Sequence, residues 1–195
     1  PDEGQIFFLG NDVTKLEQHT RVRAGLVRSY QITSIFRRFT VLDNLALAVQ
    51  ARTGSSLSFW RPVAAEQALF EEAHAIATDV GLAGREDALA ATLSHGEQRA
   101  LELGLALATR PKLVLLDEPT AGMGPEESQC MIELVSRLRS RLTVLLVEHD
   151  MDAVFRLADR ISVLVNGRVI ATGTPNDIRG NAQVRRAYLG NDAGD

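Results

Sequence analysis

The spacing of hydrophobic residues changes along the chain and predicts several kinds of element. An apolar run at residues 5–9 ends in Gly10-Asn11, which predicts a short strand and a turn, and residues 22–31 contain a second expected strand. Between residues 40 and 92 apolar positions recur at three- and four-residue steps, which is typical of helices. Residues 54–56, a Gly-Ser-Ser segment, are expected to break this helical stretch.

The second half of the chain has the alternation of an α/β protein. A helix is expected over residues 100–109, ending before Pro111. Continuous apolar runs then predict strands of a parallel sheet that are buried on both faces, separated by helices. These strands are expected at 113–116, 143–147 and 161–165, and the helices at 126–139 and 152–158. Asn166-Gly167 predicts a hairpin to a further strand at 169–171.

We therefore expect an α/β core at both ends of the chain with a helical insertion between them. The runs around Leu113, Leu145 and Val163 are expected to be its central strands.

Composition narrows the class of protein. A length of 195 residues with 45% hydrophobic residues is enough for one sizeable core or two lobes. The net charge of -4 and the aromatic content of 5% argue against a nucleic-acid partner. The single cysteine excludes an intrachain disulfide, and the apolar runs are too short to cross a bilayer.

Two carboxylates follow the most apolar predicted strand. Leu113-Val114-Leu115-Leu116 leads directly into Asp117-Glu118-Pro119. Ligands of open α/β sheets bind at the carboxyl ends of the strands, where Asp117 would help to hold Mg²⁺ beside nucleotide phosphates. Glu118 would polarise a water for attack on the terminal phosphate. The alternative is a strand that ends in a polar turn.

Ser94 and Glu97 have the spacing of a capping box at the start of a helix, and this purely structural role is a complete explanation of the pair. The same geometry also suits an anion site, because Ser94 offers a hydroxyl and Gly96 lets a ligand approach free amides. His149, after the 143–147 run, is expected at the same sheet edge as Asp117, where it would hydrogen-bond a γ-phosphate. Gln31 taken alone is a loop residue.

The order of these segments resembles the ATP-binding cassette (ABC) family. Its Gln loop, signature, Walker B strand, D-loop and switch His correspond to Gln31, residues 93–98, 113–118, 121–124 and His149. The resemblance covers essentially the whole chain. It implies an α/β ABC ATPase fold: a P-loop NTPase-like, RecA-type core at 1–32 and 110–195, and a helical signature subdomain at 33–109.

The resemblance implies ATP and Mg²⁺ as cofactors and a role for each site residue. Asp117 and Gln31 would serve the Mg²⁺ site, Glu118 would be the catalytic base and His149 would sense the γ-phosphate. Gln31 would also link nucleotide state to the membrane partner, and residues 34–39 would lie near that coupling surface. Ser94, Gly96 and Glu97 would contact ATP held by a second ABC subunit.

Residues 28–33, 39–45, 94–99, 120–127 and 187–190 are similar to the importer subunits for branched-chain amino acids. That similarity implies transmembrane permease subunits as partners, a second identical or different cassette, and an extracytoplasmic substrate-binding protein that delivers the cargo. It also implies a peripheral position on the cytoplasmic face of the inner (plasma) membrane. Urea or amide import and lipopolysaccharide export are alternative cargoes.

The sequence departs from the family at three places. His95 stands where the signature usually has its first Gly and Glu97 where it has Gln, and Gly124 stands where the D-loop commonly has Asp. No segment matches the phosphate-binding loop G-x-x-x-x-G-K-[ST]. We expect an N-terminally truncated cassette, inactive as it stands, with an exposed sheet edge and apolar surface. The alternative is a non-catalytic or regulatory cassette that only binds a partner.

Overall fold

The chain divides between Val147 and Glu148. The computed structural model describes residues 3–29, 35–53 and 63–188. One unit is Pro1–Val147 and the other is Glu148–Asp195. The predicted division into a core at 1–32 and 110–195 and a helical subdomain at 33–109 stays a prediction.

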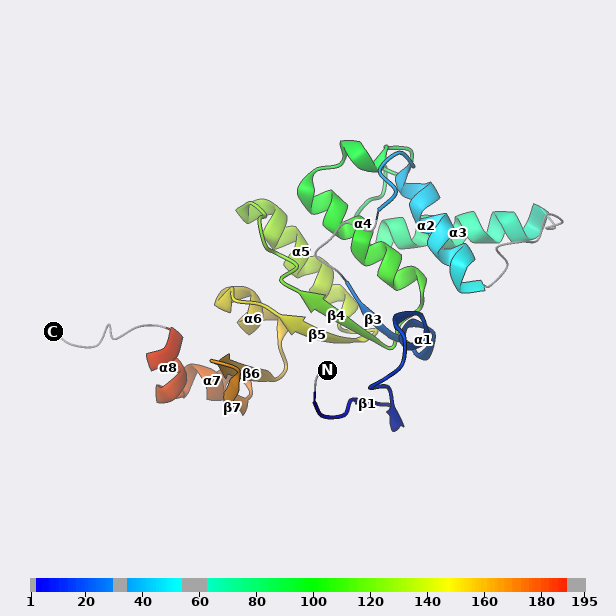
Figure 1. Cartoon of the computed structure of the whole chain (residues 1–195). Coiled ribbons are helices and arrows are strands. Elements are labelled where there is room, and N and C mark those ends of the chain that lie inside the picture. The colour runs from blue at the N-terminus through cyan, green and yellow to red at the C-terminus, as the bar shows by residue number, and fades with distance from the viewer. Residues whose placement is uncertain (1–2, 30–34, 54–62, 189–195) are drawn as a thin grey trace. The chain divides into compact units, whose positions relative to one another are not determined.

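A three-stranded parallel sheet lies at the centre of the first unit (Figure 1). Its strands, in the order in which they pair, are β3 (Leu26–Arg28), β4 (Leu113–Asp117) and β5 (Thr143–Val147). The register sets Leu26 beside Leu113 and Asp117 beside Val147, so that β4 and β5 end together. The apolar run forms the predicted strand β4; Val114 and Leu116 on one face are buried, and Leu113 and Leu115 on the other are half-buried. A small antiparallel hairpin, β1 (Phe7–Phe8) and β2 (Asn11–Asp12), precedes the sheet and confirms the expected turn.

The helices after residue 40 have the predicted order with shifted ends, whereas α1 (Gln18–Ala24) was not predicted from the sequence. The later helices of the first unit are α2 (Val41–Thr53), α3 (Val63–Asp79), α4 (His95–Ala108) and α5 (Pro125–Leu138), with a 3₁₀ turn at Ala90–Thr92. Helices α2, α3 and α4 pack on one another, and α4 also contacts α5 (Figure 1). Gly104 lets α4 approach the others closely, because a Cβ there would lie 2.9 Å from Leu45 Cδ2 and 3.4 Å from Ile76 Cγ2. The break predicted at residues 54–56 lies outside the described residues.

An ion pair joins the last turns of α2 and α4 to the middle of α3. Arg52 of α2 donates to both carboxylate oxygens of Glu72 of α3 at 2.7 Å, and also to the Ala108 carbonyl at the end of α4 at 2.7 Å. Arg110 adds a further hydrogen bond to Glu72 at 3.1 Å. The hydrogen bonds from Arg52, together with the charge of Arg110, lower the pKa of Glu72 from its ordinary value of 4.5.

Replacing Glu72 by Gln should reduce stability in a pH-dependent way. Because the pKa of Glu72 is lower in the folded state, its contribution is fully present above 4.5 and is lost as the pH falls through the folded pKa. We expect a loss of about 1 kcal/mol at neutral pH. Denaturant unfolding at pH 7 and pH 3 measures it: Glu72→Gln should differ from the parent at pH 7, and the difference should be smaller at pH 3. The matched control is Glu71→Gln, an exposed neighbour that accepts a hydrogen bond from Gln67 within α3. An equal effect of both variants would contradict the assignment.

The second unit is a hairpin packed against short helices. It contains α6 (Met151–Leu157), β6 (Ile161–Val165), β7 (Arg168–Gly173), α7 (Pro175–Gly180) and α8 (Ala182–Tyr188). Asn166 and Gly167 both have positive φ, 49° and 75°, which confirms the predicted two-residue hairpin turn. The small core of this unit is built from Ile161, Val163, Ile178 and Val184.

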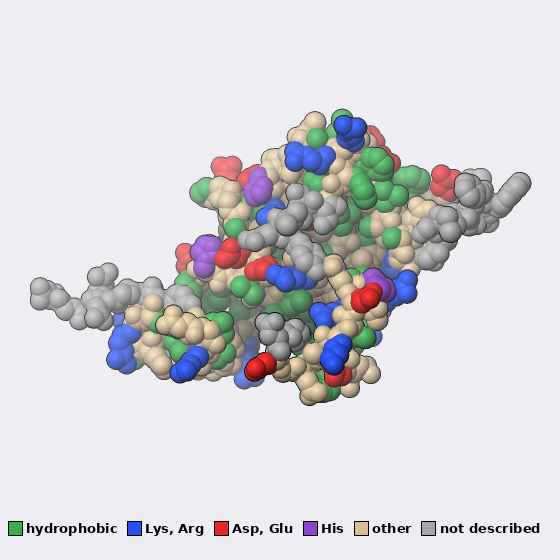
Figure 2. Space-filling model, in the orientation of Figure 1, with side chains coloured by type: hydrophobic (Ala, Val, Ile, Leu, Met, Phe, Trp, Pro, Cys, Tyr) green, Lys and Arg blue, Asp and Glu red, His purple; other side chains and the backbone are tan. Residues whose placement is uncertain are grey.

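Two expectations about the strands are wrong. In the described part of the chain β6 pairs only with β7, antiparallel, and is not a central strand of the parallel sheet. β5 lies at the edge of the described three-stranded sheet, not at its centre, and it is not buried on both faces, because Leu145 and Val147 are 54% and 56% exposed. An apolar run shows which residues prefer burial, but it does not show which partner strand or cover they meet. Hydrophobic side chains reach the surface in several places (Figure 2). Among the described residues, no helix is long and apolar enough to span a membrane.

Candidate functional site

The carboxylates predicted to serve Mg²⁺ (Asp117) and catalysis (Glu118) lie where β4 ends. Asp117 is the last residue of β4 and pairs in register with Val147 of β5. The Glu118 N–H donates to the Val147 carbonyl at 2.8 Å, which ties the residue after β4 to the end of β5. Glu118 has a φ of 47°, in the left-handed region that a glutamate rarely adopts. Backbone strain of this kind persists only where the surroundings fix it, and it is concentrated at functional sites.

Arg28 holds the Asp117 carboxylate in place. This arginine is the last residue of β3, and its Nη2 lies 2.7 Å from Asp117 Oδ2. Both side chains are partly exposed to solvent. Sequence reasoning missed this pair, because the two residues lie 89 positions apart and only the register of β3 on β4 brings them together.

The oxygen donors at this edge suit Mg²⁺. This cation prefers carboxylate oxygens and keeps several waters, so a site with few protein ligands is adequate. Asp117 and Glu118 are the carboxylates at this edge that would hold it. No cluster of three or more His, Cys, Asp or Glu that could enclose a metal occurs among residues 3–29, 35–53 and 63–188. The predicted contribution of Gln31 falls outside the described residues.

Ser94 and Glu97 form the capping box that their spacing predicts. The Ser94 hydroxyl accepts from the Glu97 N–H at 3.2 Å, and the Glu97 carboxylate accepts from the Ser94 N–H at 2.8 Å. Glu97 also pairs with Arg85 at 2.9 Å. Both residues therefore start α4, and Glu97 is committed to that structural role in addition to any contact with a ligand.

A second carboxylate reaches the start of α4 from α5. Oε1 of Glu127 accepts hydrogen bonds from the Ser94 hydroxyl at 2.9 Å and from the Gly96 N–H at 3.0 Å. The Gly96 amide, followed by the Ser94 hydroxyl, lowers the pKa of Glu127. The ring of His95 lies near the Ala121 carbonyl, with Nε2 at 3.4 Å. The start of α4 is thus joined to residues 121–127, the segment that follows Glu118.

His149 belongs to the second unit, so its place beside Asp117 and Glu118 stays a prediction. Its Nδ1 lies 3.9 Å from Glu148 Oε2, and its side chain is largely exposed.

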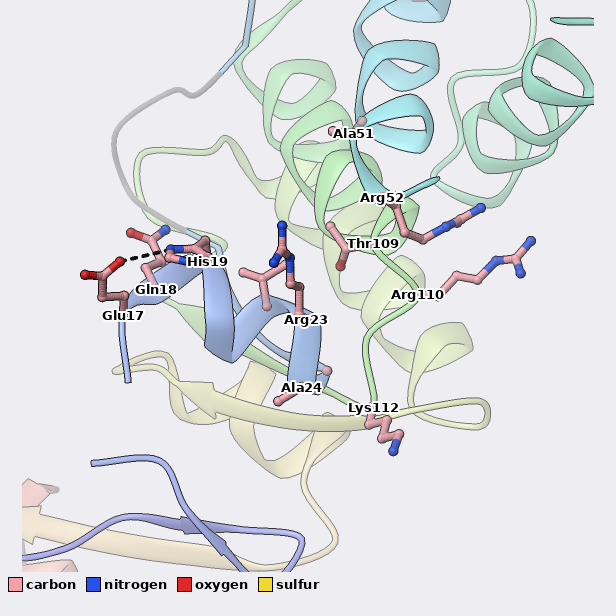
Figure 3. A pocket seen from close by; sticks show the side chains of 13 residues that line it. Glu17, Gln18, His19, Arg23, Ala24, Ala51, Arg52, Thr109, Arg110 and Lys112 are labelled. Carbon is pink, nitrogen blue, oxygen red and sulfur yellow. Dashed lines mark ion pairs between the residues drawn. The ribbon is translucent and has the colours of Figure 1, made fainter. Parts of the chain in front are cut away.

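Within the first unit, a cleft of about 920 Å³ lies away from Asp117 and Glu118. Its wall is basic, with Arg23, Arg52, Arg110 and Lys112 on it, and His19 pairs with Glu17 at its edge (Figure 3). Gly25 and Lys112 place the cleft at the amino ends of β3 and β4, whereas Asp117 is at the carboxyl end. Five residues of strand separate the two ends by roughly 16 Å, so the cleft is not the predicted phosphate site.

Comparison with known proteins assigns the class of this fold and site. Residues 1–121 match the ABC transporter family, and residues 168–194 match the branched-chain amino acid ATP-binding cassette transporter family. A solved ATP-binding cassette of an ABC transporter, MJ1267 in its ADP conformation, is 30% identical with a TM-score of 0.79. That comparison covers 97% of this chain and 78% of MJ1267. The chain belongs to the ABC transporter family, and it is a nucleotide-binding ATPase subunit coupled to transport.

Among the ABC transporter proteins, the chain is similar to ATP-binding subunits whose cargo is known. The chain is 37% identical to the high-affinity branched-chain amino acid transport ATP-binding protein LivG of Salmonella typhimurium, over 93% of this chain and 76% of LivG. It is 36% identical to BraF of Pseudomonas aeruginosa, over 97% of this chain and 77% of BraF. The lipopolysaccharide export ATP-binding protein LptB of Haemophilus influenzae is 34% identical, over 97% of this chain and 75% of LptB.

Proposed function

We propose that the chain is the ATP-hydrolysing subunit of an importer for branched-chain amino acids. The observation that supports this cargo most directly is the match of residues 168–194 to the branched-chain amino acid cassettes. The identity to LivG and BraF agrees with it. LptB is almost as similar, so lipopolysaccharide export is the competing assignment, and urea or amide import is a further one.

The proposed chemistry takes place at the carboxyl end of β4. Asp117, held by Arg28, would serve Mg²⁺, which neutralises phosphate charge when it is bound. Glu118 would accept a proton from the attacking water, from a backbone position that β5 fixes. Gln31 and His149 would contact the metal and the γ-phosphate respectively. Ser94, Gly96 and Glu97 would contact the ATP of the opposite subunit, because a hydroxyl and amides at a helix start bind anions.

The proposed assembly follows from this division of the site. A second cassette, identical or different, would complete each ATP site. Transmembrane permease subunits would bind the pair of cassettes at the cytoplasmic face of the inner membrane and respond when the pair closes on ATP. A substrate-binding protein outside would deliver the amino acid. Nucleic acid has no place in this assembly.

Uptake by cells lacking the gene tests the cargo. Deletion should abolish high-affinity uptake of radiolabelled leucine, isoleucine and valine, and the parental gene should restore it. A Glu118→Gln gene should not restore it. Normal amino-acid uptake together with lost urea uptake, or with a defect in surface lipopolysaccharide, would transfer the assignment to one of the alternative cargoes.

A further inference from the structure

The start of α4 is already occupied by an anionic group of the same chain. A single oxygen, Glu127 Oε1, accepts from both the Ser94 hydroxyl and the Gly96 N–H, at 2.9 and 3.0 Å. These are the two donors that the proposed function assigns to a phosphate oxygen. The Ser94 and Glu97 amides are used by the capping box, so this end of α4 donates chiefly to oxygens of its own chain.

Gly96 makes this contact possible. A Cβ at this position would lie 3.0 Å from Glu127 Oε1, 3.1 Å from its Cδ and 3.2 Å from its Cβ. Contacts that short require the glutamate to move. The glycine therefore accommodates the Glu127 side chain, in addition to any approach by nucleotide.

Glu127 and a phosphate cannot hold the same donors together. Both are anions, so a phosphate oxygen that arrives at Ser94 and Gly96 meets like charge as well as occupied hydrogen bonds. Glu127 lies in the first turn of α5, and residues 119–126 connect it to Glu118. Release of Glu127 would therefore remove one of the contacts that tie this segment to the start of α4, beside the contact of His95 with the Ala121 carbonyl.

We propose that Glu127 competes with the γ-phosphate of ATP for Ser94 and Gly96, and leaves these donors when the partner cassette closes. This proposal rests on the proposed function, because it takes the start of α4 as the surface that meets ATP. Glu127 is then a positioning residue: it sets the ATP concentration at which the pair of cassettes closes, without touching the reacting atoms.

Steady-state ATP hydrolysis by the complete subunit, purified in the assembled transporter, is the first test. Glu127→Gln keeps the shape of the side chain and removes its charge. The KM for ATP should fall roughly two- to five-fold, the effect of an exposed charge, with little change in kcat. Glu126→Gln, the exposed neighbour on α5, removes the same charge and should leave KM unchanged. An unchanged or increased KM in Glu127→Gln would overturn the competition.

A second measurement separates failure of this proposal from failure of the proposed function. The amide signal of Gly96 is followed by ¹⁵N NMR while inorganic phosphate is titrated into the complete subunit and its Glu127→Gln variant. The variant should respond at a several-fold lower phosphate concentration. An equal response in both proteins overturns the competition even where ATP is hydrolysed normally. An assembled transporter that hydrolyses no ATP would instead refute the proposed function, whatever the Gly96 signal does.

Discussion

Replacing Glu118 by Gln is expected to lower ATP hydrolysis by the complete subunit roughly 100- to 10,000-fold, the contribution of a general base. Binding of Mg-ATP should survive. The amide keeps the size of the carboxylate but cannot accept the proton of the attacking water. The backbone at this position, with its N–H on the Val147 carbonyl at 2.8 Å, does not depend on the side chain, so the fold should be retained.

Phosphate release and calorimetric titration of Mg-ATP measure the two halves of this prediction. Glu133→Gln, which removes the same charge from an exposed residue of α5, is the matched control and should hydrolyse ATP normally. Failure of the complete Glu118→Gln subunit to bind Mg-ATP would favour the alternative of a non-catalytic or regulatory cassette. Full hydrolysis by the same variant would remove Glu118 from the role of base.

Local sequence patterns predicted most of the strands and helices, and they also predicted the capping box at the start of α4. The 113–116 run, the Asn166-Gly167 turn and the Ser94–Glu97 spacing each carry their information within a few residues, and the structure confirms all three. Periodicity and capping chemistry act over that same range, so they can be recognised without knowledge of the fold.

The contacts that complete the site could not be predicted in this way. Arg28 meets Asp117 across 89 positions, and Glu127 meets Gly96 across 31. The residues next to Arg28 and Glu127 in the sequence do not indicate these contacts, because an isolated charged residue is normally solvated. The partner of a strand is equally non-local, and for this reason β6 was wrongly expected in the parallel sheet. The only earlier indication of Glu127 was its position in the 120–127 segment that resembles the importers.

Replacing Gly96 by Asp should affect both the thermal stability of the subunit and its ATP hydrolysis, and a second substitution can tell the two effects apart. Position 96 is the second residue of the helix, where a negative charge interacts favourably with the helix dipole. Its side chain would nevertheless collide with Glu127, whose Oε1 lies 3.0 Å from the ideal Cβ position. It would also place a second carboxylate against the donors that the ATP phosphate needs. We expect hydrolysis by the assembled transporter to fall roughly 100-fold, as when a preorganised phosphate or oxyanion donor is lost.

Thermal unfolding and ATP hydrolysis together test this prediction. Ala91→Asp adds the same charge to the exposed 3₁₀ turn before α4 and should change neither quantity. The double variant Gly96→Asp with Glu127→Ala removes the carboxyl group against which the new side chain would collide, but it leaves the new charge facing the ATP phosphate. It should therefore regain thermal stability without regaining hydrolysis. Recovery of hydrolysis in the double variant would show that Gly96 matters only because Glu127 packs on it, and that ATP does not use this end of α4. Normal hydrolysis by Gly96→Asp alone would exclude the start of α4 from the nucleotide site altogether.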